Sequence, residues 1–462
     1  MTTTEQIAAF ADVPGPQGSG VAGVAPEFLR DPIAVLARAH RDHGDLVAFP
    51  FGPRKGPLGK VVVAAYHPDA ARQVLTETER TIGRGPSSTQ VLDDMIGRNL
   101  MTTDGAEWRR QRRTLQPLFT PKRVAQYTDL MAAEAARIVA EDVPAGTTAD
   151  RVDLHRLMLR YSLRVVGRAL FSGDIDYTAP ELHKLIPLTN ELIIGRTTQL
   201  LKPPLALPTP RNRAFLRTKA QLYALIDRIL ARSDAEAGGA ERDDIVTRLR
   251  TARDPETGAG LSDAEIRDQT LLMMMAGHET TATALTFALH LLGRHAEVQQ
   301  AVADEALEYT RGGGTPAEFA QQRESLARAS LLESMRLYPP VYMTEHLATA
   351  DIVLGGYRVP AGTAVFLSPW VTHRHPEFWP EPERFDPHRF VGEHDRPRYA
   401  YLPFGGGPHV CIGEHFALLA ATVLLEAVLR KFRIESLEES VSYQQTGNLR
   451  PDKPVWAALT AR

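Results

Sequence analysis

Cysteine is nearly absent from this sequence, which has one thiol in 462 residues. A single cysteine cannot form an intrachain disulfide, and such usage is typical of proteins that fold in a reducing compartment such as the cytoplasm. The chain is long enough to bury a large apolar core without covalent cross-links. The sequence therefore predicts a cytoplasmic protein in which Cys411 forms no intrachain disulfide.

The sequence also has no large excess of charge of one sign and no evident membrane segment. Lys and Arg total 53 against 56 Asp and Glu, a net charge of -3, which gives no overall field for nucleic acid or an anionic membrane. The first 20 residues have no basic start followed by an apolar stretch. The apolar run at 271–292 has His278, Glu279 and Thr280 near its centre, where charge in lipid is costly. We expect a monomer that has no membrane anchor and binds no nucleic acid.

The chain shows neither internal repeats at a fixed period nor a change of composition that would mark a linker between domains. Its start is rich in proline and glycine and has no clear helical or strand pattern. We therefore expect a flexible N-terminus over residues 1–13 and a single domain over residues 14–462.

Helical patterns outnumber strand patterns. Apolar residues recur at three- and four-residue spacing through most of 68–253. Ser262 and Glu265 form a candidate capping box, after which no proline interrupts a helix of about thirty residues. The β-prone runs at 46–51 and 60–66 predict a hairpin, and a later β-prone stretch adds further strands. The predicted fold class is mainly α with a minor β subdomain.

The only thiol lies in a glycine-rich loop, FGGGPHVCIG, that leads into a predicted helix at about 413–432. A helix N-terminus stabilises a thiolate, and glycines let a flat ligand approach the sulfur. A lone cysteine is otherwise most often a small buried apolar residue. Here Phe404 lies seven residues before Cys411, Gly407 lies four before it and His409 two before it. Gly413 follows two residues after Cys411. This spacing resembles the haem-ligand loop of the cytochromes P-450.

The resemblance implies the cytochrome P-450 fold, with haem b between a long central helix and the cysteine loop with the last helix. Cys411 would be the axial ligand of the haem iron. Phe404 and Gly413 would line the haem as parts of the same loop. His409 departs from the arginine that commonly binds a haem propionate at this position, and a neutral imidazole supplies less charge than arginine.

Three residues outside the loop resemble the family's other haem contacts. Trp108 and Arg112 share a helix face four residues apart, and their N–H groups suit a propionate. His346 falls where the family often has another propionate-binding arginine, although a structural histidine is the alternative. Arg110 and Arg113 lie on other faces of the same helix, where we expect them to face a partner protein.

A buried Glu-Arg-Arg triad is the family's structural signature. Glu333 and Arg336 lie three apart on one helix face, which alone would be an ordinary surface pair. The sequence PERF about fifty residues later resembles the segment that supplies the second arginine, Arg384. The three residues would form a network that specifies geometry more than it adds stability.

The long helix contains AGHETT at 276–281, which resembles the family's oxygen-activation motif. The resemblance implies that Ala276 and Gly277 lie against the haem, with Gly277 making room beside the iron. Glu279 and Thr280 would deliver protons to bound dioxygen. The alternative is that the Thr280 hydroxyl only donates a hydrogen bond back to its own helix.

Other metal and nucleotide motifs fail. The zinc-protease pattern that begins at His278 would need histidine at Ala282, and the pair His373 and His375 has no evident third ligand, so we expect no metal there. No phosphate or dinucleotide loop is present, and the chain ends soon after the last helix, leaving no room for a fused reductase. Electrons derived from NAD(P)H would come from a separate ferredoxin and ferredoxin reductase.

The predicted function is that of a haem-thiolate monooxygenase, which inserts one atom of dioxygen into an apolar small molecule by hydroxylation or epoxidation. A terpenoid or polyketide of secondary metabolism is the expected substrate. The alternative is a fatty-acid hydroxylase, with Arg196, Lys202 or Arg213 binding the carboxylate. A haem carrier or sensor without turnover and a thiolate-haem isomerase or dehydratase are the competing classes. The segments expected to contact substrate are 83–99, 192–210, 273–280 and 341–344.

Overall fold

The computed structural model describes residues 7–52, 59–77, 80–142, 149–173, 175–199, 202–237 and 243–462. The chain divides into two compact units. Unit 1 comprises Met1–Pro86, Arg336–Phe385 and His394–Cys411, and unit 2 comprises Ser87–Met335, Asp386–Glu393 and Ile412–Arg462. The chain enters and leaves these units repeatedly, and a single domain over 14–462 stays a prediction.

Unit 1 is built on a five-stranded sheet with the order β1-β2-β8-β5-β3. These strands are β1 (Leu46–Phe51), β2 (Lys60–Ala65), β3 (Ile82–Arg84), β5 (Thr344–Ala348) and β8 (Ala364–Leu367). β1 and β2 pair antiparallel, which confirms the predicted hairpin. Most residues of β2 and β8 are buried, including the consecutive Val63, Ala64 and Ala65, so both faces of these strands are covered.

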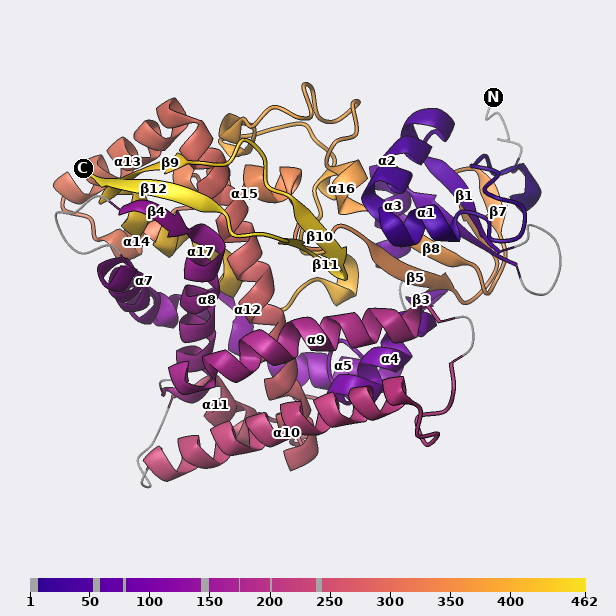
Figure 1. Cartoon of the computed structure of the whole chain (residues 1–462), viewed down its shortest axis with the longest axis horizontal. Coiled ribbons are helices and arrows are strands. Elements are labelled where there is room, and N and C mark those ends of the chain that lie inside the picture. Colours follow the sequence, from indigo (N-terminus) through magenta and orange to yellow (C-terminus); the bar gives the residue numbers. More distant parts are fainter. Residues whose placement is uncertain are drawn as a thin grey trace. The chain divides into compact units, whose positions relative to one another are not determined.

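Short helices and a second hairpin accompany this sheet (Figure 1). They are α1 (Ala25–Arg30), α2 (Pro32–His43), α3 (Pro68–Thr76), α16 (Pro369–Thr372), β6 (Ile352–Leu354) and β7 (Tyr357–Val359). α2 begins where the Asp31 carboxylate accepts the N–H of Ala34 at 3.0 Å. It ends at Gly44, whose φ of 89° suits glycine.

The N-terminal segment is more ordered than the sequence suggested. Residues 1–6 of the predicted flexible terminus 1–13 lie outside the described residues. Ala8, however, pairs with Tyr357 of β7 and exchanges backbone hydrogen bonds with Gly356 and Arg358. Val13 is buried in the core of unit 1. Residues 8–13 are thus held by backbone pairing and an apolar anchor, and the flexibility of the terminus stays a prediction.

Unit 2 is mainly helical. Its helices are α4 (Pro86–Ile96), α5 (Gly105–Leu115), α6 (Pro121–Val124), α7 (Thr128–Asp142), α8 (Leu154–Phe171), α9 (Ala179–Thr197), α10 (Pro210–Ala237), α11 (Ile245–Thr251), α12 (Asp263–Arg294), α13 (Ala296–Arg311), α14 (Pro316–Ala320), α15 (Leu326–Leu337) and α17 (Glu414–Leu429). α9 and α10 lie side by side (Figure 1), and α12 packs against α8, α10 and α17. Among the described residues, no helix has both the length and the apolarity to cross a membrane.

The predicted long helix and last helix are confirmed as α12 and α17. Ser262 and Glu265 form the expected capping box: Ser262 Oγ accepts the N–H of Glu265, and the Glu265 carboxylate accepts the N–H of Ser262 at 2.8 Å. α17 begins at Glu414, with Gly413 as its N-cap. Both helices bury most of their residues, which explains their near-continuous apolar sequences.

Two small sheets complete unit 2. One has the order β4-β12-β9, formed by β4 (Ala149–Asp153), β12 (Trp456–Ala461) and β9 (Phe432–Ser436). The other is the hairpin of β10 (Tyr443–Thr446) and β11 (Asn448–Pro451). The described chain is thus mainly α with minor β structure, as predicted.

Candidate functional site

The thiol of the cysteine loop in unit 1 lies at the protein surface. Cys411 is exposed, and its backbone N–H donates to the carbonyl of Phe404 at 3.0 Å, which closes the loop. Gly407 has a φ of 64°, and a Cβ there would lie 1.9 Å from the carbonyl oxygen of Leu75. Only glycine fits this position, so the close approach of loop and α3 fixes where Cys411 stands.

Basic side chains meet beside this loop. Nη2 of Arg84 lies 2.6 Å from Nδ1 of His409, and Arg84 is the cross-strand partner of His346. Burial, aided by the charge of Arg84, lowers the pKa of His346 to about 4, so this histidine is neutral at pH 7. Sequence reasoning missed Arg84, because only the pairing of β3 with β5 brings it to the two histidines.

In unit 2, most residues of α12 are buried, but one face of this helix is only half-buried; we call it the half-open face. The half-buried residues that recur at helical spacing on it are Met273, Ala276, Gly277 and Thr280. A Cβ on Gly277 would lie 3.1 Å from Cγ2 of Val166 in α8. The glycine was predicted to make room beside the iron, and the structure gives it a second role, since it lets α8 pack close to α12.

Glu279 is buried and has two polar partners in unit 2. Its Oε2 accepts a hydrogen bond from Asn190 Nδ2 of α9 at 3.0 Å. Its Oε1 lies 3.3 Å from Nη1 of Arg450 in β11. Arg450 is itself held by Gln444 of β10. Two elements, α9 and β11, therefore hold this carboxylate, and neither partner was identified from the sequence, because both lie far from Glu279 along the chain.

The Thr280 hydroxyl donates to the carbonyl of Ala276 at 2.6 Å. This is the back-bond that the sequence left open as an alternative. A hydroxyl oxygen that donates one hydrogen bond still has lone pairs that can accept others. The back-bond therefore fixes the direction of the hydroxyl and leaves its acceptor capacity for a ligand.

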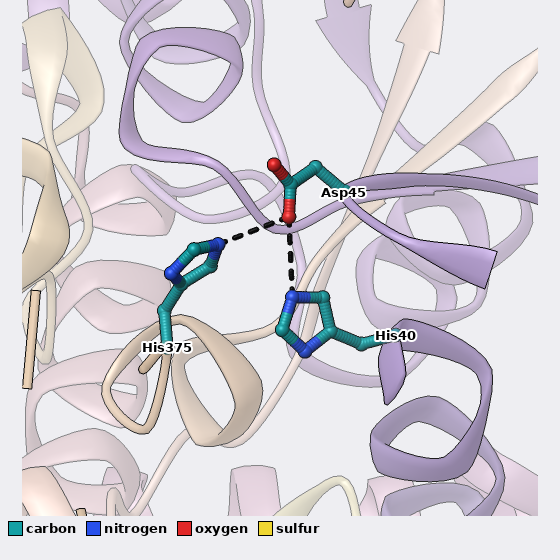
Figure 2. Close-up of side chains that lie close together, drawn as sticks. All are labelled: His40, Asp45 and His375. Atoms are coloured by element: carbon teal, nitrogen blue, oxygen red, sulfur yellow. Dashed lines mark hydrogen bonds and ion pairs between the residues drawn. The ribbon is translucent and has the colours of Figure 1, made fainter. Parts of the chain in front are cut away.

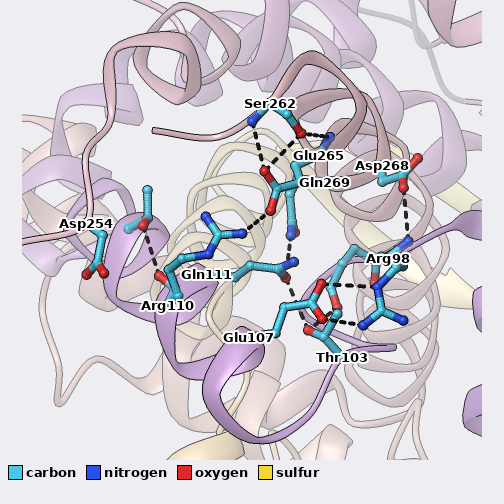
Figure 3. Close-up of polar contacts among 12 residues, drawn as sticks. Arg98, Thr103, Glu107, Arg110, Gln111, Asp254, Ser262, Glu265, Asp268 and Gln269 are labelled. Carbon is cyan, nitrogen blue, oxygen red and sulfur yellow. Dashed lines mark hydrogen bonds and ion pairs between the residues drawn. The ribbon is translucent and has the colours of Figure 1, made fainter. Parts of the chain in front are cut away.

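α5 carries the predicted haem contacts Trp108, which is buried, and Arg112, which is half-buried one turn later. Two other arginines of this helix, Arg110 and Arg113, bind carboxylates, and Figure 3 shows Arg110 beside Glu265. Arg110 pairs with Glu265, and Arg113 binds Asp254 with two hydrogen bonds of 2.9 Å. These two arginines make ion pairs within unit 2, and their contact with a partner protein stays a prediction.

A polar network ties the segment before α5 to α12 (Figure 3). Asp268 accepts the backbone N–H of Arg98 at 2.9 Å and the hydroxyl of Tyr223 at 2.8 Å. Gln269 donates to Gln111 at 2.8 Å. Because burial and hydrogen bonds fix these groups, the segment after α4 is positioned by α12.

The predicted Glu-Arg-Arg triad needs a correction. Arg384 is exposed, and its guanidinium pairs with Glu381 at 3.1 Å. In unit 2, the buried Glu333 carboxylate instead accepts the N–H of Asp386 at 2.9 Å and lies 3.6 Å from Nε of Arg389. The sequence analysis assigned Arg384 from this segment, whereas Arg389, five residues later, is an arginine that lies near Glu333.

The other predicted triad member keeps a structural role in unit 1. The guanidinium of Arg336 is fully buried and donates to three carbonyls, those of His373 at 3.0 Å, Pro382 at 2.6 Å and Arg384 at 3.1 Å. Arg336 thus fixes the irregular chain around Pro382. Arg384 contributes its backbone carbonyl to this network, whereas its side chain points into solvent.

His375 lies close to Asp45 and His40, which the sequence analysis did not identify (Figure 2). Asp45 Oδ1 lies 3.0 Å from Nε2 of His375 and 3.1 Å from Nε2 of His40, so these residues could hold a metal ion. The N–H of Glu377, however, donates to Nδ1 of His375, which leaves the neutral ring its proton at Nε2. Nε2–H then donates to Asp45, and this geometry describes a hydrogen-bonded cluster that joins α2, β1 and the segment after α16.

The arrangement within each unit fits a haem. Unit 1 supplies an exposed thiol in a loop with glycines for a flat ligand, and nearby N–H donors that suit carboxylates. Unit 2 supplies a half-open helix face with small residues at Ala276 and Gly277.

The comparisons with known proteins agree with this chemistry. The profile of the family described as "Cytochrome P450" matches residues 14–455. The chain is 36% identical to cyclooctatin synthase of Streptomyces melanosporofaciens over 428 residues, 91% of this chain and 90% of that protein. It is 36% identical to cyclooctat-9-en-7-ol 5-monooxygenase of the same organism over 88% of this chain and 85% of that protein. It is 31% identical to pentalenene oxygenase of Streptomyces avermitilis over 90% and 89% of the two chains.

Such similarity extends over nearly the whole described chain, including both units and every predicted haem contact. An enzyme of this kind needs dioxygen and electrons from redox partners. The chain therefore belongs to the cytochrome P450 family and is a haem-thiolate monooxygenase.

Proposed function

We propose that this enzyme hydroxylates or epoxidises a terpenoid of secondary metabolism, with haem b bound through the Cys411 thiolate. The observation that carries the proposal is the similarity over nearly the full length to a cyclooctat-9-en-7-ol 5-monooxygenase and a pentalenene oxygenase. Terpenoids are largely apolar, and such ligands suit concave sites lined by aliphatic side chains.

The haem, when bound, supplies the activation of dioxygen, which the protein cannot achieve with side chains alone. Cys411 would ligate the iron, and Trp108, Arg112, His346 and His409 would bind the propionates. The roles of the chain's own groups are binding, orientation and exclusion of water from the reacting carbon.

Proton delivery would fall to Glu279 and Thr280. Thr280 lies on the half-open face of α12, with its hydroxyl oriented by Ala276. Glu279 is one residue away and is held by Asn190 and Arg450. A buried carboxylate with such partners can pass a proton only when one contact loosens, so Asn190 and Arg450 would regulate the transfer.

A fatty-acid hydroxylase is the second candidate, and the structure gives it less support. Arg196 was one of the predicted carboxylate ligands. Its guanidinium donates to Asn212 Oδ1 at 3.1 Å and to the carbonyl of Pro203 at 3.2 Å. It therefore supports the segment between α9 and α10, and a carboxylate would have to displace these contacts. Arg213 is exposed on α10.

We further propose a monomer in the cytoplasm that receives electrons from a ferredoxin and a ferredoxin reductase. A single cysteine, which cannot form an intrachain disulfide, suits a reducing compartment. No dinucleotide loop was found in the sequence, which favours electron supply by a partner protein.

The test begins with the purified holoprotein. The difference spectrum of the reduced protein with and without carbon monoxide should show the red-shifted band of a thiolate ligand, and Cys411→Ser should lose it. Cyclic terpene hydrocarbons and alcohols are then compared with medium-chain fatty acids by substrate-binding spectra. The best binder is incubated with ferredoxin, reductase, NADPH and ¹⁸O₂.

Incorporation of one ¹⁸O atom into a terpenoid supports the proposal. Binding and oxidation of fatty acids alone would replace it with the second candidate. A product formed without NADPH would contradict the monooxygenase reaction and favour an isomerase or dehydratase.

A further inference from the structure

Asp268 of α12 is half-buried and accepts hydrogen bonds from two other elements of unit 2. Its Oδ2 accepts the backbone N–H of Arg98, in the segment that follows α4, at 2.9 Å (Figure 3). Its Oδ1 accepts the hydroxyl of Tyr223 in α10 at 2.8 Å. Each oxygen of this carboxylate therefore holds a different element to α12.

The segment after α4 comes close to Asp268 because it has glycine at position 97. Gly97 has a φ of 76°, and a Cβ there would lie 2.5 Å from the hydroxyl oxygen of Tyr223 and still closer to Oδ2 of Asp268. Any side chain at this position would push these groups apart. The contact of this segment with α12 thus depends on the glycine.

Further contacts fix α10 at the same place. Nζ of Lys219 donates at 2.7 Å to the carbonyl of Asp94, in the last turn of α4, where carbonyls have no partner within the helix. Two cations lie over the ring of Tyr223: Nζ of Lys219 is 5.6 Å and the guanidinium carbon of Arg267 is 4.8 Å from its centroid. The hydroxyl of Tyr223 is therefore held in its direction toward Asp268.

The ionised carboxylate of Asp268 depends on its two donors. Burial raises its pKa above the ordinary value, whereas the hydrogen bonds from Tyr223 and from the N–H of Arg98 lower it. A buried group that loses a hydrogen bond keeps the cost of its removal from water. Movement of either α10 or the segment after α4 away from α12 therefore costs free energy.

We propose that Asp268 is a positioning residue that controls how fast an apolar substrate enters and leaves the enzyme. This inference rests on the proposed function, because α4 belongs to 83–99, one of the segments expected to contact the substrate. While Asp268 holds both donors, α10 and the chain after α4 stay against α12. A substrate covered by α4 can leave only after this chain moves, so the breaking of the two hydrogen bonds limits the rate.

The experiment uses the holoprotein with Asp268→Asn, Tyr223→Phe and the control Asp227→Asn. Asp227 of α10 lies 3.5 Å from Arg267 of α12 and is 53% exposed, so the control removes the same charge from a surface contact between the same helices. The probe is clotrimazole, a bulky apolar azole that shifts the absorption of the haem, and its association and dissociation rates are measured by stopped flow. Hydrogen exchange compares residues 97–103 with α17.

Asp268→Asn should bind and release clotrimazole about tenfold faster than the wild type, because the amide nitrogen cannot accept the second hydrogen bond. Since both rates rise, the dissociation constant should change by less than about twofold. Tyr223→Phe keeps the ring and removes one donor, so its rates should rise about threefold. In both variants residues 97–103 should exchange faster while α17 keeps its protection, and Asp227→Asn should behave like the wild type.

Equal clotrimazole rates in Asp268→Asn and Asp227→Asn would overturn the inference and leave the proposed function intact. Faster hydrogen exchange of residues 97–103 with unchanged clotrimazole rates would refute the control of substrate exchange. If Asp268→Asn does not fold, Tyr223→Phe decides by the same comparison. Failure of the proposed function is seen separately, as ¹⁸O incorporation into fatty acids alone, which does not enter these rates.

Discussion

Glu279 and Thr280 are neighbours on α12 with different surroundings. The carboxylate of Glu279 is buried between α9 and β11, whereas Thr280 belongs to the half-open face of the helix. Neighbouring positions of a helix point about 100° apart, so one residue can face a ligand while the other contacts the protein. This separation gives each a distinct, testable role.

Thr280→Ala should keep the haem-thiolate spectrum and continue to consume NADPH, with most of the electrons released as hydrogen peroxide. The variant loses the hydroxyl that the Ala276 carbonyl orients, while the apolar packing changes little. The measurement is the ratio of product to NADPH consumed. Thr280→Ser, which keeps a hydroxyl, is the control and should retain most of the coupling. Normal coupling in Thr280→Ala would refute the role of Thr280 in proton delivery.

His278 predicts a pH dependence of stability. It is buried in α12 with its ring stacked against His183 at 6.0 Å, and burial lowers its pKa to about 3. Because the folded pKa lies below the ordinary value of 6.5, the unfolded chain binds the proton more readily. The contribution of neutral His278 to the free energy of unfolding is therefore complete above pH 6.5, and it is lost as pH falls toward 3.

Between pH 7 and pH 5 this single group should cost about 2 kcal/mol of the free energy of unfolding. His278→Phe keeps a ring and removes the titration, so its unfolding free energy should fall less over this range. Urea unfolding at several pH values measures the difference. His388→Phe, at an exposed position, should behave like the wild type. Parallel curves for His278→Phe and the wild type would contradict the assignment.

Helices and strands that have strong local signals in the sequence were predicted correctly. The capping box located the start of α12, and two β-prone runs separated by turn residues located the hairpin of β1 and β2. Both signals depend on residues close together in the chain. The segment between Pro376 and Pro397 has no such periodicity, and there the sequence analysis assigned Arg384, whereas the structure places Arg389 near Glu333.

Arg389→Ala and Arg384→Ala should therefore have different effects. Arg389 lies 3.6 Å from the fully buried Glu333, and its removal takes a positive charge away from that buried carboxylate, which should cost about 3–5 kcal/mol of the free energy of unfolding. Arg384 is 62% exposed, and its loss should change the stability by at most about 0.5 kcal/mol. Thermal unfolding and the haem content of the expressed protein measure both. Equal effects would contradict the corrected triad.

Contacts between distant segments explain what the sequence could not predict at the scale of the molecule. Arg450 approaches Glu279 from 171 residues away, and Arg84 approaches His409 from 325 residues away. No local pattern marks such pairs, because tertiary packing alone brings them together. The family motifs predicted the cysteine loop and the α12 motif, whereas the partners that hold these groups required the structure.

The interleaving of the chain leads to a prediction about fragments. Residues 87–335 contain most of unit 2, but they lack 386–393 and 412–462. Without these segments, α7 and α12 lose their packing against α17, and β4 loses its neighbour β12 in the sheet. Glu333 would also lose the backbone N–H of Asp386.

The fragment 87–335 should therefore keep helical circular dichroism without a cooperative unfolding transition, because much of the apolar surface of its long helices would lie in water. The full chain should unfold cooperatively under the same conditions. Hydrogen exchange supplies the measurement: amides of α12 should be protected in the full chain and exchange rapidly in the fragment. Strong protection in the fragment would mean that its own helices suffice for the core, and that the C-terminal segments are added to an already folded body.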